Sequence, residues 1–279
     1  MNGDELLSRY AQGKRNFREV NLNGANLQDC DLRDIDFRRA NLINCNLQNA
    51  NLQGVNFREA NLQGAIFIGA NLRETNFISA HLRQANLSDT DLRDANLRAA
   101  QLQKACFKQA NLSETSLHEV DLTQANLDVA NLTDANLIRS NLTRASLKGA
   151  ILEGANLTIT TLNEANLEEA NLVKAILHST NLVGANLNRA DLSKAKLTGS
   201  NLADATAVKA QLRAANVSWT TLRGINLTGA SLYRTNLSWS NLTGAILTDA
   251  VLMSANISHV TLKDAILTGA MMPDGTAYQ

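Results

Sequence analysis

The chain has 279 residues with a balanced charge, 26 Lys plus Arg against 26 Asp plus Glu. This balance gives no global field that would attract nucleic acid or imitate it. Three cysteines are too few for a disulfide framework and indicate a reducing compartment. No apolar run approaches the roughly 18 residues of a membrane-spanning helix, and the first residues lack the regions of a signal peptide. We therefore expect a cytoplasmic protein that contacts neither membranes nor nucleic acid directly.

Residues 1–14 precede the regular part of the sequence and predict a short helix. Leu6, Leu7 and Tyr10 fall on one face of a helix over residues 4–11. A stack of β-structure exposes unpaired backbone groups at its end unless another segment covers them. We interpret residues 1–14 as an N-terminal capping helix.

Residues 15–272 consist of one five-residue repeat without insertion or deletion. The third residue of the 52 repeats is Leu in 42 cases and Phe in six. The first residue is small or apolar in every repeat but one, the second is Asn or Asp in 33, and all twelve glycines occupy the fifth position. The first three residues alternate inward and outward, which is typical of a very short strand. The last two predict a turn with a positive φ at its second residue.

Rare aromatic residues recur every twenty residues. Phenylalanine does so from Phe17 to Phe77, and the two tryptophans, Trp219 and Trp239, have the same spacing. Like side chains stack well along a solenoid, so the spacing favours four repeats in each coil. The 52 repeats then predict an all-β parallel β-helix of about thirteen four-sided coils. Ala207 replaces the central Leu of one repeat, where either the coil tightens or the solenoid bends.

Residues 273–279 follow the last repeat and begin with a Pro-Asp-Gly turn. We expect this segment to close the second end of the solenoid. A stack covered at both ends presents no open edge to another copy, so we expect a monomer.

The repeats ANLQD, ANLQG, ANLSD and ADLSK resemble the pentapeptide-repeat family, whose pattern is A-(N/D)-L-X-X. The resemblance covers residues 15–272 and implies the fold of that family, a right-handed quadrilateral β-helix. The ends, YAQGKRNF and LTGAMMPDGT, resemble those of cyanobacterial members, in particular the one that regulates heterocyst differentiation by engaging a transcription factor. The resemblance therefore implies a protein-binding role, with a transcription regulator as the partner.

The sequence contains no recognisable constellation of catalytic or metal-binding residues. The four histidines are scattered, at positions 81, 118, 178 and 259. His118 and His178 would lie three coils apart, roughly 14 Å, which is too far to share a metal ion. A solenoid also offers no cleft that would perturb its outward carboxylates. We expect a protein that is not an enzyme and needs neither cofactor nor metal.

One candidate binding surface consists of outward aromatic residues near the end of the repeat. Trp219, Trp239 and His259 share one outward position, each after a serine, and Tyr233 lies on a neighbouring face. Large outward aromatic side chains within about two coils are typical of anchors in protein interfaces. Alternatively, these rings stack on one another and stiffen the last coils.

A second candidate surface is a row of arginines near the start of the repeat. It contains Arg18, Arg38, Arg58 and, after an isoleucine, Arg98. Glu19, Arg39 and Glu59 alternate in sign beside it. Either these charges pair with one another on a solvated face, or the guanidinium groups bind an acidic partner.

Three functions are compatible with these features. The first is a non-catalytic scaffold that presents rows of side chains to a cytoplasmic protein. The second, implied by another branch of the resembling family, is mimicry of DNA to engage gyrase. The neutral charge and the arginine row disfavour it, because DNA carries a negative charge about every 1.7 Å. The third is a structural spacer.

Overall fold

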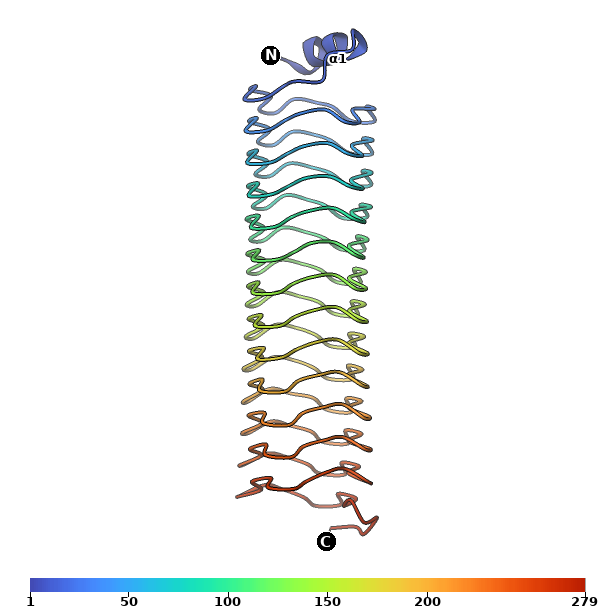
Figure 1. Cartoon of the computed structure of the whole chain (residues 1–279), viewed down its shortest axis with the longest axis vertical. Helices are drawn as coiled ribbons and strands as arrows, with labels where there is room; N and C mark the ends of the chain where they lie inside the picture. Colours follow the sequence, from blue (N-terminus) through green and yellow to red (C-terminus); the bar gives the residue numbers. More distant parts are fainter. Residues whose placement is uncertain (279) are drawn as a thin grey trace. The chain divides into compact units, whose positions relative to one another are not determined.

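A computed structural model describes residues 1–278, which fall in two compact units, Met1–Ser140 and Asn141–Gln279. We call them the N-terminal and the C-terminal unit. Within each unit the chain winds in successive coils that stack on one another (Figure 1). The one helix of the described residues is α1, Gly3–Ala11, at the start of the N-terminal unit.

Within each unit, parallel bridges join second residues of repeats that are twenty positions apart, as in Asn41–Asn61 and Asn216–Asn236. Four repeats therefore make up one coil in each unit. The expected three-residue strands do not form, because within residues 1–278 the parallel pairing consists of isolated single-residue bridges. A turn follows every third residue, so only the middle one lies between two extended neighbours.

The backbone of a typical repeat has a hydrogen-bond acceptor for all five amide groups. The amide of the first residue donates to the carbonyl three residues earlier and closes the preceding turn. The amide of the second residue donates to a carbonyl of the preceding coil, and the amides of the third and fifth residues donate to carbonyls of the following coil. The amide of the fourth residue donates to the side-chain oxygen of the second residue. For residues 40–44 the acceptors are, in order, the carbonyls of Phe37, Val20 and Asn61, the side chain of Asn41 and the carbonyl of Gln63, at 3.0, 2.8, 2.7, 3.3 and 2.9 Å. The second position is therefore rich in Asn and Asp because the turn needs that side-chain acceptor.

The fifth residue of the repeat adopts a left-handed backbone, which confirms the turn predicted from the position of the glycines. In the non-glycine residues at this position, φ ranges from 53° at Asn44 to 63° at Trp239. This conformation ordinarily costs a residue other than glycine about 1–2 kcal/mol. The cost is tolerated because the amide of the same residue is bonded to the next coil.

The core consists of the third residues together with the mostly small first residues, and its composition differs between the two units. In the N-terminal unit Phe57 stacks between Phe37, with ring centroids 5.7 Å apart, and Phe77, at 4.9 Å. The C-terminal unit contains no phenylalanine and has a row of buried hydroxyls at the first position, each donating to a carbonyl 23 residues earlier. The donors are Thr180, Ser200, Thr220 and Ser240. Thr115 and Ser140 make the same bond in the N-terminal unit.

Ala207 does not interrupt the register of the C-terminal unit. Its amide donates to Asn226 at 2.7 Å, and its carbonyl accepts the next turn bond from Ala210 at 3.1 Å. These lengths match those of the surrounding repeats. The missing Leu side chain is therefore accommodated with the hydrogen-bond ladder intact.

The first coil is covered by α1. Asn2 caps this helix by accepting the amide of Glu5 at 2.9 Å, and Leu6 is fully buried. The hydroxyl of Tyr10 donates to the carbonyl of Arg33 at 3.1 Å, which ties the end of the helix to the coil. The helix covers the coil only partly, since Cys30, the first residue of its repeat, is only half-buried.

At the other end, Met271 pairs with Ala277 in an antiparallel bridge, and Tyr278 donates its amide to Ala270 at 2.8 Å. The chain thus folds back on the last repeat, while Ile257 and Leu262 of the last coils remain half-buried. Gln279, the end of the expected closing segment 273–279, lies outside the described residues. The division into residues 1–14, 15–272 and 273–279 stays a prediction.

Candidate binding surfaces

Three exposed rings form a continuous stack in the C-terminal unit, which we call the aromatic row: Trp219, Trp239 and His259. Each is the fifth residue of its repeat and lies one coil from the next. The ring centroids of Trp219 and Trp239 are 5.0 Å apart with an interplanar angle of 4°, and those of Trp239 and His259 are 4.0 Å apart at 19°. Both tryptophans remain exposed, by 62% and 49%.

Trp219 is the more exposed of the two because its neighbour in the preceding coil is a glycine. Gly199 lies twenty residues earlier, and a Cβ placed there would meet only the hydroxyl of Ser179, at 3.7 Å. One face of the Trp219 indole therefore lacks a side chain against it. The serine before this ring is nearly buried, and its hydroxyl donates to Asn216 at 2.9 Å. The serine thus belongs to the turn rather than to the exposed surface.

Tyr233, expected on a neighbouring face, has cationic neighbours of its own. The guanidinium groups of Arg213 and Arg234 lie 5.5 Å and 5.0 Å from its ring centroid. The structure therefore brings Trp219, Trp239 and His259 together and gives Tyr233 cationic neighbours instead.

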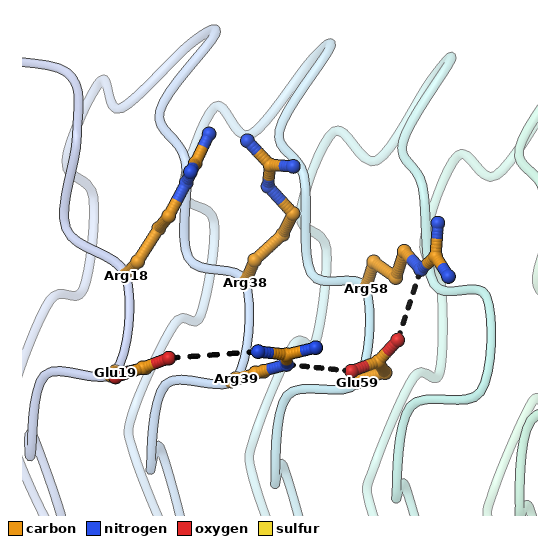
Figure 2. A pocket seen from close by; sticks show the side chains of 6 residues that line it. All are labelled: Arg18, Glu19, Arg38, Arg39, Arg58 and Glu59. Atoms are coloured by element: carbon orange, nitrogen blue, oxygen red, sulfur yellow. Dashed lines mark hydrogen bonds and ion pairs between the residues drawn. The ribbon is translucent and has the colours of Figure 1, made fainter.

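Four arginines of the N-terminal unit line a surface groove of about 280 Å³. Figure 2 shows the side chains of Arg18, Arg38 and Arg58, which we call the arginine row, extending from one corner of successive coils. A second line runs beside them and completes the groove. It consists of Glu19, Arg39 and Glu59.

Each guanidinium group of the groove has a carboxylate close by. Asp36 accepts from Arg38 at 2.7 Å and from Arg18 at 2.6 Å. Arg39 lies between two acids, 2.7 Å from Glu59 and 3.7 Å from Glu19. Arg18, Arg38 and Arg39 are thus paired with carboxylates of the chain itself.

Hydrogen bonds from Arg39, and secondarily from Arg58, lower the pKa of the Glu59 carboxyl from its ordinary value. The same pairing with Glu59, followed by its charge, raises the pKa of Arg39. Both shifts favour the charged forms of Arg39 and Glu59.

Arg98, the fourth arginine expected in the row, lies outside the groove because Ile78 occupies the intervening coil. It is 3.5 Å from Glu119, which also lies 3.9 Å from Arg139 and 3.4 Å from the ring of His118. Sequence reasoning missed this shared carboxylate, although the twenty-residue spacing of Glu119 and Arg139 could have indicated part of it.

Two family profiles together match most of the chain. "Pentapeptide repeat region" matches residues 40–117, and "Pentapeptide repeats (8 copies)" matches residues 16–54, 115–154, 150–189, 185–229 and 230–269. The chain belongs to the pentapeptide-repeat family. Members of this family fold as right-handed quadrilateral β-helices and are generally structural or binding proteins rather than enzymes.

Several solved structures are similar to this pentapeptide-repeat protein. HetL, a protein involved in heterocyst differentiation regulation from the cyanobacterium Nostoc sp. strain PCC 7120, is 31% identical over 100% of both chains, with a TM-score of 0.34. A pentapeptide-repeat protein of the Arabidopsis thaliana thylakoid lumen is 34% identical over 37% of this chain and 68% of its own, with a TM-score of 0.28. QnrB1, a plasmid-mediated fluoroquinolone resistance protein, is 16% identical over 88% of this chain and 90% of its own, with a TM-score of 0.22. No match is found among curated proteins.

The remaining reactive groups of this pentapeptide-repeat protein do not gather into a site. Across residues 1–278, no three His, Cys, Asp or Glu side chains are placed to hold a metal ion. None of the helical structure in that range is long and apolar enough to cross a bilayer. Burial raises the pKa of the Cys45 thiol to about 11, and its sulfur lies 2.7 Å from the carbonyl of Leu22. Cys45 is therefore a core residue with little thiolate at neutral pH.

Proposed function

We propose that this protein is a non-catalytic scaffold whose repeat, residues 15–272, presents rows of side chains to a cytoplasmic partner protein. In this proposal the 52 repeats make about thirteen coils, covered by residues 1–14 and 273–279. The scaffold acts as a monomer and needs no cofactor. Its information lies in the outward positions, because the inward ones are occupied by a uniform core.

The observation that carries this proposal is the aromatic row. Exposed tryptophan is enriched among the residues that contribute most to protein interfaces. The amides of Trp219 and Trp239 each donate to the next coil at 3.0 Å, which fixes the backbone, and the two rings stack on each other with centroids 5.0 Å apart, which orders the side chains. A partner would therefore lose little conformational entropy in ordering them. Stacking alone contributes only about 0.5–1.5 kcal/mol per pair, which is a weak reason to keep two indoles in water.

Regulation of heterocyst differentiation is the process that we propose for this scaffold. The support is HetL, which is involved in that regulation and shares 31% identity over the full length of both chains. A transcription regulator is then the proposed partner.

The two alternatives have weaker support. Mimicry of DNA by a gyrase-binding protein requires a long acidic face, whereas this chain has 26 acidic and 26 basic residues and a line of arginines in its N-terminal unit. A structural spacer requires no exposed aromatic rings, so this function would leave the aromatic row unexplained.

The test is capture of the partner from the source cells, followed by a measured affinity with purified proteins. The double variant Trp219→Ala plus Trp239→Ala is expected to weaken binding by at least about tenfold, which corresponds to 1.4 kcal/mol. Ile159→Ala is the matched control, because Ile159 is also a fifth residue of the C-terminal unit and is 51% exposed. Unchanged affinity of the double variant would remove the aromatic row from the proposal.

A further inference from the structure

The arginine row has two intervals, and only the first contains a carboxylate of the chain itself. Between Arg18 and Arg38, Asp36 accepts from the Nε and Nη2 atoms of Arg38 at 2.9 and 2.7 Å and from Arg18 at 2.6 Å. The corresponding residue between Arg38 and Arg58 is Asn56, whose side-chain oxygen accepts the backbone amide of Arg58 at 3.1 Å. The second interval therefore repeats the guanidinium pair of the first without its negative charge.

The donors of this second interval are largely unused. Arg58 directs its Nε to Glu59 at 3.1 Å, and Arg38 directs its Nε and Nη2 to Asp36. The Nη1 and Nη2 atoms of Arg58 and the Nη1 atom of Arg38 make no hydrogen bond to any described residue. Their side chains are 54% and 37% exposed, so a ligand can reach these atoms from solvent.

The charges of the groove leave one positive charge in excess. Its guanidinium groups are those of Arg18, Arg38, Arg39 and Arg58, and its carboxylates are those of Glu19, Asp36 and Glu59. Arginine binds carboxylates with a planar fork of donors, as Asp36 already demonstrates one coil away. One monoanionic carboxylate would therefore neutralise the groove.

We propose that the interval between Arg38 and Arg58 binds the carboxylate of an Asp or Glu side chain in an acidic segment of the partner protein. This inference rests on the proposed scaffold function and names the chemistry of a second contact. A doubly charged phosphate suits the interval less well, because Glu59 lies directly beside Arg58.

The decisive variant is Asn56→Asp, which supplies the missing carboxylate from the chain itself. Aspartate already occupies the second position of five other repeats, so the variant keeps the fold; these residues are Asp31, Asp36, Asp91, Asp121 and Asp191. The matched control is Asn96→Asp, which adds the same charge beside Arg98, outside the groove.

The probe is a fluorescein-labelled Gly-Glu repeat peptide, and the measurement is fluorescence anisotropy with purified full-length protein at low ionic strength. A Gly-Gln peptide is the neutral reference. We expect Asn56→Asp to weaken binding of the Gly-Glu peptide by about tenfold, because it places a like charge in the site, and Asn96→Asp to change it by less than about twofold.

Three results would overturn the inference. The wild-type protein could bind the Gly-Glu and Gly-Gln peptides equally, or the two aspartate variants could weaken binding to the same extent. Inorganic phosphate could also displace the peptide at lower concentration than acetate does, which would assign the interval to phosphate. None of these results bears on the tryptophan variants, so failure of this inference and failure of the proposed function are distinguishable.

Discussion

The two units use the same repeat but differ in where they place their aromatic side chains. The N-terminal unit buries the six phenylalanines of the chain at the central position and exposes charges at the corner. The C-terminal unit contains no phenylalanine and exposes its aromatic rings instead, at Trp219 and Trp239. Arg39 and Trp239 even occupy equivalent positions, fifth in the repeat and in the same phase of the twenty-residue spacing.

This difference shows that the fold constrains the inward and outward positions unequally. A third residue is enclosed by its neighbours above and below, so it must fill a fixed volume. A fifth residue needs only a left-handed backbone, which its own amide bond to the next coil maintains. Arginine, alanine and tryptophan all meet that requirement, at φ values of 55° for Arg39, 56° for Ala99 and 63° for Trp239. Function can therefore vary at the corners without altering the core.

The largest expected effect separates a ring inside the core from a ring outside it. Phe57→Ala is expected to lower the free energy of unfolding by about 3–5 kcal/mol, because it leaves a cavity between two stacked rings. Trp239→Ala is expected to cost only about 1 kcal/mol, mainly through lost stacking on Trp219 and His259. Urea unfolding followed by circular dichroism measures both.

Phe107→Ala refines this experiment, because Phe107 is equally buried but lies outside the set of paired rings. The excess cost at Phe57 over Phe107 then measures ring stacking, expected at about 1 kcal/mol. A cost at Trp239 as large as that at Phe57 would contradict the distinction between the two units, since the exposed ring would then be part of the core.

The second effect concerns the buried hydroxyls. Thr180→Val keeps the shape of the side chain and removes its 2.7 Å bond to the carbonyl of Leu157. That carbonyl still accepts the amide of Thr160 at 3.1 Å, so it is not left unpaired, and the expected cost is about 1 kcal/mol. Thr243→Val is the control, because the hydroxyl of Thr243 bonds only to Asn241 on an exposed turn. Equal costs for the two variants would show that the buried row contributes nothing specific.

Sequence reasoning predicted the repeat, the turn and the inward and outward positions, because each follows from a single residue and its spacing. Gly24 and the other glycines marked the left-handed position, and the spacing of Trp219 and Trp239 marked the length of a coil. The partners of surface charges were harder to predict. Asp36 bonds both to its own repeat, at Arg38, and to the coil before, at Arg18, and the choice depends on side-chain rotamers that spacing does not specify.

A smaller effect should be common to both units, which tests whether their corners follow the same rules. At Gly54 and Gly224, a Cβ would meet the carboxylate oxygen of the aspartate one coil earlier at 2.4 and 2.5 Å. At Gly184 the nearest contact is an ordinary 3.7 Å. Replacement by Ala costs about 1 kcal/mol at each site because φ is positive. Gly54→Ala and Gly224→Ala should exceed Gly184→Ala by a few tenths of a kcal/mol, the cost of turning an exposed side chain away. Thermal unfolding of the three variants checks this order.

The smallest effect is the pH dependence of the charged corner, and it should distinguish that corner from the aromatic one. Arg39 lowers the pKa of Glu59 in the folded protein below the ordinary value of 4.5. A carboxyl whose pKa is lowered by folding stabilises the folded state above its unfolded pKa, and this contribution is lost as the pH falls through the folded pKa. The N-terminal unit should therefore lose part of its stability below about pH 4.5, and Arg39→Gln should make the loss shallower by returning the pKa of Glu59 toward its ordinary value. Thermal unfolding from pH 7 to pH 3, together with an NMR titration of Glu59, measures both quantities. Replacing Trp239 by Ala should leave this pH dependence unchanged, since its ring carries no proton that titrates in the range. A change in the acid response with Trp239→Ala would mean that the aromatic row and the Arg39–Glu59 pair are not independent. An unchanged acid response with Arg39→Gln would mean that the Arg39–Glu59 pair does not set this pH dependence.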